Sequence, residues 1–351
     1  MSNSLEIDFL AVGKGEKSGD AIAFRYGDFS DATKQTVIVI DGGTKESGKE
    51  LCELIKNNYG TKTIDVVVCT HPDGDHASGL TEVLGDEELT ISHLLIHKPW
   101  EHSVSIKDLF HDGRITSNSL SDRLKSAYNY AYECVEIAEK RKINIHEPFS
   151  GVSYDNGTIK FLGPNKDYYQ SLLPDFAKSP KAKESILQKS FSAVNEAENW
   201  VKETMQLETL SEDGETSAEN NSSAVLLIEF DSEKYLFTGD TGVPALKRVI
   251  DYCAKQQIDI SNIRFMQVPH HGSKRNISPS ILNSIKCKTA FVSASKDAPK
   301  HPSKKVINAY IRRGAKVFTT EGNGVRYKKN APTRSGWSTA TPEPFHEKVE
   351  E

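Results

Sequence analysis

The segment from Thr63 to His76 constrains the fold of this chain most, because it joins a buried strand to a dense group of polar side chains. The run TIDVVVC is almost continuously apolar, which is typical of a strand covered on both faces. A helical pattern, ESGKELCELIKNNYG, precedes it and ends in a glycine suited to a C-cap. The residues after Cys69 are therefore predicted at the carboxyl edge of a sheet, where ligands usually bind in α/β proteins.

Four residues of types that bind metals stand directly after this strand. They are His71, Asp73, Asp75 and His76. A short loop can fold imidazole and carboxylate groups at this spacing toward one point. The same sequence also suits an ordinary polar turn, because Pro, Asp and Gly favour turns. The hexapeptide alone therefore leaves both interpretations open.

Two distant segments place the same chemistry after further predicted strands. KYLFTGD ends in Asp240, and RFMQVPHHGS carries His270 and His271. Asp240 alone could cap the helix that follows it, and a histidine pair alone could belong to a turn. If the three strands are neighbours, all of these side chains converge, so the set predicts one metal centre.

The rest of the chain alternates between strand and helix patterns, which indicates an α/β protein. Three short strands open the chain, and after the strand at residues 63–69 another is predicted at residues 92–99. An amphipathic helix is predicted over residues 120–142, and a hairpin turns at Asn156-Gly157. A further turn is predicted at Asp231-Ser232, within an alternating second half.

The domain organisation is predicted as one catalytic domain at residues 1–325 and a polar tail at residues 326–351. Residues 165–220 are rich in Lys, Glu, Ser and Asn, and helical stretches around 184–205 lead to the acidic run SEDGETSAENN. We expect this region to be an insertion that ends in a mobile loop over the site.

Composition excludes several classes of function. The net charge is -5 and the pI is near 6.2, so a nucleic-acid partner would need a local basic patch. The start of the chain lacks a signal-peptide pattern, and no stretch is apolar enough to cross a bilayer, so the expectation is a cytoplasmic protein without membrane contact. The five cysteines lack CxxC spacing and are expected to be reduced and structural.

The motifs resemble those of the metallo-β-lactamase superfamily, whose pattern is His-x-His-x-Asp-His followed by a late Asp and a late His. Within it, they are most similar to the soluble domain of the ComEC-like DNA-uptake proteins. The matching pieces, in order over about residues 5 to 324, are FLAVGKG with DAIAF, VIVIDGG, THPDGDHASGL, NNSSAVLLIEF, LFTGD, VPHHGSK and HPSKKVINAYIRRGAKVFTTEGNG. The resemblance implies an αββα sandwich, in which two mixed β-sheets pack together and helices cover their outer faces.

The resemblance also implies a set of metal ligands. One metal would be held by His71 and Asp73, a second by Asp75 and His76, and Asp240 would bridge them.

Two positions in this ligand set stay open. Either His270 or His271 would complete the second site. The superfamily's third-motif histidine falls where this chain has Asn220, Asn221 and Ser222. That departure leaves the first site short of a nitrogen ligand and puts its occupancy in doubt.

Asp73 stands where the superfamily has a histidine. A carboxylate makes a site harder and more anionic, which favours manganese or magnesium relative to zinc. We therefore expect one or two divalent ions, manganese or zinc, with magnesium also possible. Two ions about 3.5–4 Å apart are the usual arrangement for phosphodiester hydrolysis by a metal-activated water. Asp75 is the residue expected to orient or deprotonate that water.

Several residues are expected to contact the substrate. Ser273 and Lys274 follow the histidine pair and suit phosphate, although a solvated loop is an equal alternative for Lys274. Asn221 is also expected to contact the substrate. His301 lies at a position where the ComEC-like pattern also has His-Pro and is expected to protonate a leaving group, with a surface histidine as the alternative. A basic cluster surrounds it, made of Lys296, Lys300, Lys304 and Lys305.

Three functions are compatible with these residues. The leading hypothesis is a phosphodiesterase or nuclease that acts on DNA. The first alternative is a hydrolase of a small phosphodiester, thioester or lactone, because one fold hosts many reactions. The second is a regulatory module that binds metal without turnover.

Overall fold

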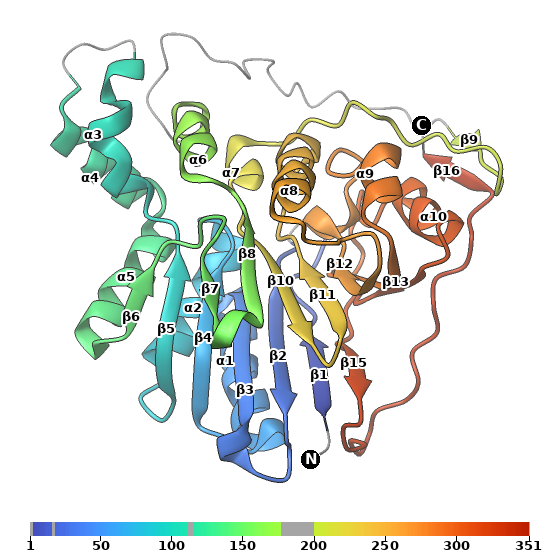
Figure 1. Ribbon diagram of the computed structural model, residues 1–351, viewed down its shortest axis with the longest axis horizontal. Helices are drawn as coiled ribbons and strands as arrows, with labels where there is room; N and C mark the ends of the chain where they lie inside the picture. Colours follow the sequence, from blue (N-terminus) through green and yellow to red (C-terminus); the bar gives the residue numbers. More distant parts are fainter. Residues whose placement is uncertain (1–2, 16–17, 111–114, 177–199, 351) are drawn as a thin grey trace.

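Two seven-stranded β-sheets form the centre of the computed structural model, which describes residues 3–15, 18–110, 115–176 and 200–350. The sheets pack face to face, and helices cover the outer face of each (Figure 1). This is the αββα sandwich that the sequence predicted.

The first sheet has the strand order β15-β1-β2-β3-β4-β5-β6. Its strands β15, β1, β2 and β3 pair antiparallel, and β3 to β6 pair parallel. The bounds are β1 Ser4–Phe9, β2 Ala21–Gly27, β3 Gln35–Gly42, β4 Thr63–Cys69, β5 Thr90–Ile96, β6 Asn144–His146 and β15 Val325–Lys329.

The second sheet has the strand order β14-β13-β12-β11-β10-β8-β7. Strands β11 to β14 pair parallel, so their carboxyl ends lie at one edge. The bounds are β7 Ser153–Tyr154, β8 Ile159–Gly163, β10 Val225–Phe230, β11 Glu233–Phe237, β12 Ile263–Gln267, β13 Cys287–Val292 and β14 Lys316–Thr319. Two further strands, β9 Trp200–Lys202 and β16 Lys348–Glu350, pair with each other.

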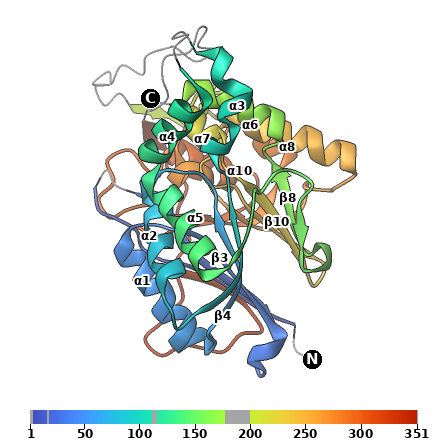
Figure 2. The ribbon, with the colours of Figure 1, turned by 90° about the vertical axis from the view of Figure 1, so that its left-hand side faces the viewer.

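The helices divide between the two outer faces. Figure 2 shows α1, α2 and α5 beside the first sheet and α8 on the side of the second. The bounds are α1 Lys45–Glu53, α2 Gly74–Gly85, α3 Ser103–Ile106, α4 Ser117–Ala127, α5 Asn129–Arg141, α6 Lys166–Leu172, α7 Ala218–Asn221, α8 Val243–Gln256, α9 Pro279–Ser284 and α10 Lys304–Arg312. In the described parts of the chain, none of the helices has both the length and the apolar character that a bilayer span requires.

Strand β4 explains why the fold needs two covering layers. Val66 and Val68 face the core between the sheets, whereas Val67 and Cys69 face the core beneath α1, α2 and α5. Because side chains alternate along a strand, an almost continuous apolar run requires apolar partners on both faces. The predicted buried strand is thus confirmed, and it carries His71 to the edge of the sheet.

One helix prediction was wrong in detail. The stretch predicted as a single helix over residues 120–142 forms two helices, α4 and α5, separated at Tyr128. Tyr128 has φ -112° and ψ 50°, outside the helical region, and its buried hydroxyl donates to Glu219 at 2.9 Å. This long-range contact overrides a helical periodicity that continues on both sides of it.

The predicted insertion and tail also differ from expectation. Of the helical stretches expected around 184–205, residues up to 199 lie outside the described residues, and Trp200–Lys202 form strand β9 rather than helix. The stretch expected as a polar tail contains the end of β15 and strand β16, because these edges pair with β1 and β9. The division into a domain at 1–325 and a tail stays a prediction.

Candidate metal centre

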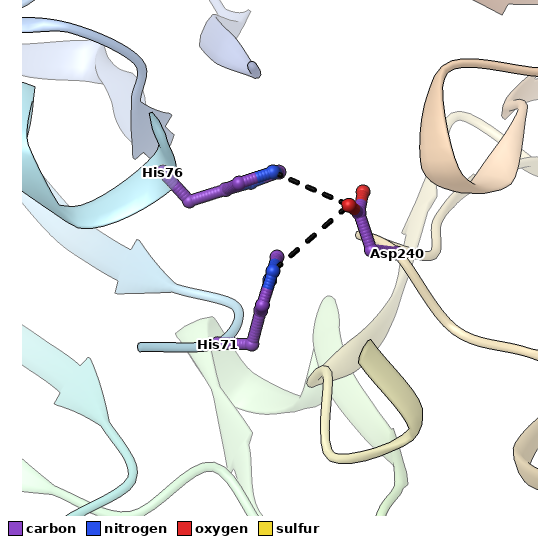
Figure 3. Close-up of side chains that lie close together, drawn as sticks. All are labelled: His71, His76 and Asp240. Atoms are coloured by element: carbon purple, nitrogen blue, oxygen red, sulfur yellow. Dashed lines mark ion pairs between the residues drawn. The ribbon is translucent and has the colours of Figure 1, made fainter. Parts of the chain in front are cut away.

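The candidate centre lies where the carboxyl ends of β4, β11 and β12 meet. The hexapeptide ends a strand and starts a helix: His71 follows β4, and His76 lies in the first turn of α2. Asp240 follows β11 from the second sheet. Figure 3 shows His71 and His76 pointing toward Asp240 from the opposite sheet. The convergence predicted from three separate motifs is therefore present in the fold.

Close packing sets the position of α2. A Cβ atom added at Gly79 would lie 1.9 Å from the carbonyl oxygen of Gly42, at the end of β3. Only glycine lets the helix approach the sheet this closely. The first turn of α2, which carries His76, is thereby held against the carboxyl ends of β3 and β4.

Three buried side chains, those of His71, His76 and Asp240, form the inner part of the centre. The Nε2 atoms of His71 and His76 lie 3.9 and 3.5 Å from Oδ2 of Asp240. Among the described residues, these two nitrogens and Oδ1 of Asp240 are buried without a hydrogen-bond partner. Buried polar atoms are nearly always paired, and separations of this length are not hydrogen bonds. A divalent cation among these atoms would satisfy all of them, so the donor set fits the metal that the fold implies.

The two adjacent histidines occupy different environments. His271 is buried, and its Nδ1 donates to the carbonyl oxygen of Ser293 at 2.8 Å, which leaves Nε2 facing Asp240 at 3.7 Å. A ring nitrogen of His271 also lies within 4.8 Å of donor atoms of Asp75 and His76. His270 is partly exposed, with Nε2 3.6 Å from Asp240. The geometry favours His271 as the partner of Asp75 and His76.

The backbone of this pair is strained. His270 has φ 47° and His271 has φ 54°, so two successive residues other than glycine occupy the left-handed region. Each such residue costs about 1–3 kcal/mol and persists only where the surroundings impose it. The strain is consistent with a site that needs both rings at the edge of β12.

The two remaining acidic residues of the hexapeptide lie at the rim. Asp73 is partly exposed, and its Oδ2 is 3.7 Å from Nε2 of His71. Asp75 is exposed at the start of α2, on the side of His76 and His271. Both are therefore accessible to water, as a ligand shared with substrate or water requires.

A buried carboxylate supports the ring nitrogens from behind. Oδ2 of Asp41 lies 2.8 Å from Nδ1 of His76 and accepts from the hydroxyl of Thr70 at 2.6 Å. The same hydroxyl lies 3.1 Å from Nδ1 of His71. Such partners fix the tautomer and orientation of metal-binding histidines. Asp41 lies near the end of β3, within the matched piece VIVIDGG.

The charges of the cluster depend strongly on one another. Burial alone would lower the pKa of His76, but Asp240 and Asp41 raise it well above its usual value. Burial would raise the pKa of Asp240, but His76, His270 and His271 hold it well below its usual range. Burial lowers the pKa of His271 to about 4, so this ring is neutral and able to coordinate at neutral pH.

The asparagines at the third-motif position do not replace the histidine. Asn220 lies with its amide nitrogen 3.3 Å from Nδ1 of His270, and Asn221 donates to the carbonyl oxygen of Ser217 at 3.1 Å. Next to them, the hydroxyl of Ser223 accepts from the backbone N–H of Asp240 at 3.1 Å. This segment positions His270 and Asp240 rather than supplying a nitrogen ligand.

The residues predicted to contact substrate differ in their burial and in their distance from the centre. Ser273 is buried and its hydroxyl accepts from the backbone N–H of Arg275, whereas Lys274 is partly exposed. The ring of His301 lies 5.6 Å from that of His270, and burial lowers the pKa of His301 to about 3. His301 is thus beside the centre, while the Ser273 hydroxyl is engaged within its own loop.

Several residues of the centre were missed by the sequence. Thr70, Ser293 and Asn276 orient His71, His271 and His270, and Asp20 adds a buried carboxylate. Hydroxyl and amide side chains carry no metal-ligand signature, so no sequence signal distinguishes them from loop residues. Asp20 belongs to the matched piece DAIAF, and this membership is the sequence signal that could have identified it.

Comparisons with known proteins agree with this architecture. The family model described as the Metallo-beta-lactamase superfamily matches residues 31–113, which include β3, β4, α2 and the hexapeptide. Proteins of that superfamily are generally metal-dependent hydrolases. The chain has the metallo-β-lactamase fold, and that fold implies a divalent metal at this edge.

Relatives match only part of the chain. ComE operon protein 3 of Bacillus subtilis (strain 168) is 31% identical over 123 residues, which are 34% of this chain and 15% of that protein. Uncharacterized protein YcaI of Escherichia coli (strain K12) is 31% identical over 113 residues, 32% of this chain and 14% of that protein. Among solved structures, a long form RNase Z from yeast is similar with a TM-score of 0.45 and 12% identity, covering 92% of this chain and 42% of that one. These matches thus span a small share of both curated relatives.

Proposed function

We propose that this chain is a metal-dependent phosphodiesterase that cleaves nucleic acid, and DNA in particular. The observation that carries the proposal is the convergence of His71, His76 and Asp240, whose buried donor atoms lack partners among the described residues. The similarity of its motifs to those of ComEC-like DNA-uptake proteins supports DNA as the substrate.

Each residue of the centre has a separate role in the proposed function. His71 and Asp73 would hold one ion, Asp75 and His76 would hold the other, and Asp240 would contribute to both. We assign His271 to the second ion, because one of its ring nitrogens lies near donor atoms of Asp75 and His76. When bound, divalent ions supply Lewis acidity to a phosphoryl group and lower the pKa of water. Manganese suits this carboxylate-rich donor set better than zinc.

Two side chains at the rim, Asp75 and His301, would take part in proton transfer. Asp75 is exposed, so its carboxylate can accept a hydrogen bond from the attacking water and orient it. His301 is neutral at neutral pH, because its pKa is lowered to about 3 by burial. A neutral ring can donate a hydrogen bond to the leaving oxygen, and an anionic phosphate beside it would raise its pKa toward full proton transfer.

Lysines around His301 are the groups that would contact the phosphate backbone. Of the predicted basic cluster, Lys305 is buried and Lys304 lies over the ring of Trp200 at 4.7 Å. Lys296 and Lys300 are exposed, and within the described ranges neither forms an ion pair. A bridge between Lys14 and Lys296 brings a third exposed lysine to this rim from the opposite sheet. Exposed cations of this kind bind phosphates without regard to sequence.

The direct test is cleavage by metal-stripped protein to which one metal is returned. We expect single- or double-stranded DNA to be cut with manganese, and less with zinc or magnesium. Metal content is measured on the same samples. Asp75→Ala should lose cleavage, whereas Glu87→Ala, an exposed change at the far end of α2, should cut normally.

The outcomes separate the three functions. Hydrolysis of bis(p-nitrophenyl) phosphate without DNA cleavage would favour a small-molecule phosphodiesterase. Tightly bound metal without turnover of any phosphodiester would favour a regulatory module. Either result, obtained with protein shown to bind metal, would overturn the nuclease proposal.

A further inference from the structure

Asp20 is a buried carboxylate beside the centre to which the resemblance assigned no role. It stands immediately before β2 and is 1% exposed. One oxygen, Oδ2, accepts from the side-chain amide of Gln267. The other oxygen, Oδ1, has no hydrogen-bond partner among the described residues, although it is buried. Buried carboxylates are normally paired or bound to a metal, so Oδ1 lacks the counter-group that its position demands.

Asp20 lies among the residues assigned to the second ion, and its Oδ1 is 4.0 Å from Nδ1 of His271. A carboxylate oxygen of Asp20 and donor atoms of Asp240 and His271 all lie within 4.8 Å of one another. The same holds for Asp20 with Asp41 and His76. His76 and His271 are the two imidazoles assigned to the second ion. Asp20 is therefore a buried carboxylate of this group, whereas Asp75 is exposed.

Hydrogen bonds connect Asp20 to the elements that carry the other donors. The amide oxygen of Gln267 accepts from the backbone N–H groups of Thr238 and Gly239 at 2.9 and 3.0 Å, in the turn that leads to Asp240. Gln267 thus holds Asp20 with one end of its amide and the approach to Asp240 with the other. On the opposite side, the hydroxyl of Ser293 donates to the carbonyl oxygen of Gly19 at 2.7 Å.

The preceding glycine allows this placement. A Cβ atom added at Gly19 would lie 2.2 Å from the carbonyl oxygen of Asp75. The segment before β2 can therefore rest against the first turn of α2 only because this residue has no side chain. Residues of α2 and β12, and Ser293 directly after β13, thus hold the segment that carries this carboxylate in place.

The neighbouring acidic groups make the unpaired oxygen more costly. Asp41 is engaged by Thr70 and His76, and Asp240 faces several histidines. Asp20 adds a third buried carboxylate within the same cluster. Three carboxylates so close together repel one another unless a cation lies among them.

We infer that Oδ1 of Asp20 is a direct ligand of the ion held by His76 and His271. This inference rests on the metal centre of the proposed function. The second ion then has carboxylates on both sides, Asp20 within the fold and Asp75 at the rim. An oxygen-rich set of this kind prefers manganese or magnesium to zinc more strongly than the hexapeptide alone.

Manganese binding by metal-stripped protein tests the inference without substrate. Titration calorimetry gives the affinity and the number of ions, and thermal unfolding gives the rise in Tm that manganese causes. For Asp20→Asn we expect at least ~10-fold weaker binding of one ion and a smaller rise in Tm. We also expect its metal-free Tm to be equal or higher, because one of three mutually repelling carboxylates is gone.

The matched control is Asp8→Asn. Asp8 is also buried in the N-terminal hairpin, but its oxygens already accept from Arg334 and Tyr59. This variant should lose stability without metal and bind manganese as the wild type does. A purely structural role for Asp20 predicts the pattern of the control instead. Wild-type manganese affinity and stoichiometry in Asp20→Asn would overturn the inference.

Two further variants keep the test decisive if Asp20→Asn does not fold. Asp20→Glu keeps the carboxylate and should restore part of the affinity, whereas Gln267→Met leaves Asp20 charged but unsupported and should weaken binding less than Asp20→Asn. Full manganese affinity in both would overturn the inference. Because every readout is metal binding, protein that binds manganese but leaves DNA intact would refute the nuclease proposal and not the role of Asp20.

Discussion

Two buried charged clusters differ in one respect, which is whether each charged group has a partner of opposite charge. In the first cluster, the carboxylates of Glu6 and Asp8 on β1 meet three arginines. Arg25 lies 3.1 Å from Glu6, Arg334 lies 2.6 Å from Asp8, and Arg326 pairs with Glu6. Each carboxylate there has a guanidinium partner, so the cluster is electrostatically complete within the protein.

The second cluster, at the carboxyl edge of the strands, is incomplete. Asp20, Asp41 and Asp240 lie among imidazole rings, and donor atoms of Asp20, His71, His76 and Asp240 lack partners among the described residues. The comparison shows that burial of charge by itself does not indicate function. Unmatched donors that converge on one point distinguish a ligand site from a structural ion-pair network.

Asp240→Asn should have the largest effect, because this residue faces every histidine of the centre. We expect phosphodiesterase activity to fall by about 10⁴-fold, equivalent to about 5 kcal/mol of barrier. Activity and metal content are measured together, with the thermal stability of the metal-free protein as the third readout. Metal-free stability at neutral pH should fall, because His76, His270 and His271 hold the pKa of Asp240 well below its usual range and the carboxylate therefore contributes stability. A variant that keeps metal and activity would remove the distinction between the two clusters.

Arg25→Met should have the next largest effect, and on stability alone. Removing one partner of a buried ion pair leaves Glu6 partly uncompensated, which costs about 3–5 kcal/mol. The free energy of unfolding is measured by urea denaturation, and manganese affinity is measured on the folded protein. We expect unchanged affinity per folded molecule. Loss of metal binding without loss of stability would contradict a structural role for the first cluster, in which Arg25 pairs with Glu6.

Asp41→Asn should have an intermediate effect, because Asp41 orients His76 from behind. Loss of such a partner typically weakens metal binding by about 10–100-fold. Titration with manganese measures this change. Asp65→Asn serves as the control, because Asp65 accepts from the backbone N–H of Val37 and lies near the start of β4, at the other end of the strand from His71. Wild-type affinity in Asp41→Asn would show that Thr70 and packing suffice to orient the ring.

The smallest effect is a pH dependence contributed by His301. Burial lowers its pKa to about 3 in the folded protein, below the ordinary value of 6.5. The unfolded chain therefore binds more protons between these values, and stability from this group is lost as pH falls from about 6.5 toward 3. In metal-free protein, His301→Gln should flatten the dependence of Tm on pH over this window. An unchanged slope in His301→Gln would contradict this contribution.

The sequence predicted the elements of the centre better than their relations. The strand ends at Cys69, Phe237 and Gln267 follow from alternation and apolar runs, so the donors after them could be assigned to one edge. The predicted turn at Asp231-Ser232 is confirmed, since both residues have positive φ between β10 and β11. The break at Tyr128 could not be predicted, because it depends on a hydroxyl contact with Glu219, 91 residues away.

The exposure of the lysines around His301 is a second feature that the sequence could not predict. Four lysines around His301 look equivalent in the sequence, yet Lys305 is buried and Lys304 lies over Trp200. Lys14, almost three hundred residues earlier in the chain, lies beside Lys296 instead. Exposure and pairing depend on which helix face and which loop a lysine occupies, and local composition does not record either.

The sequence by itself determined the alternation of strands and helices and the three strand-end motifs, because side-chain alternation and turn chemistry act over a few residues. The αββα layers followed only from the resemblance. Only the tertiary structure decided that His271 faces the ion site from a buried position, that Asp41 holds His76, and that Asp20 joins the cluster. These relations join residues from different strands and, for Asp20 and His271, from different sheets. Their distances are set by how the sheets and helices pack, and no local pattern in the chain encodes that packing.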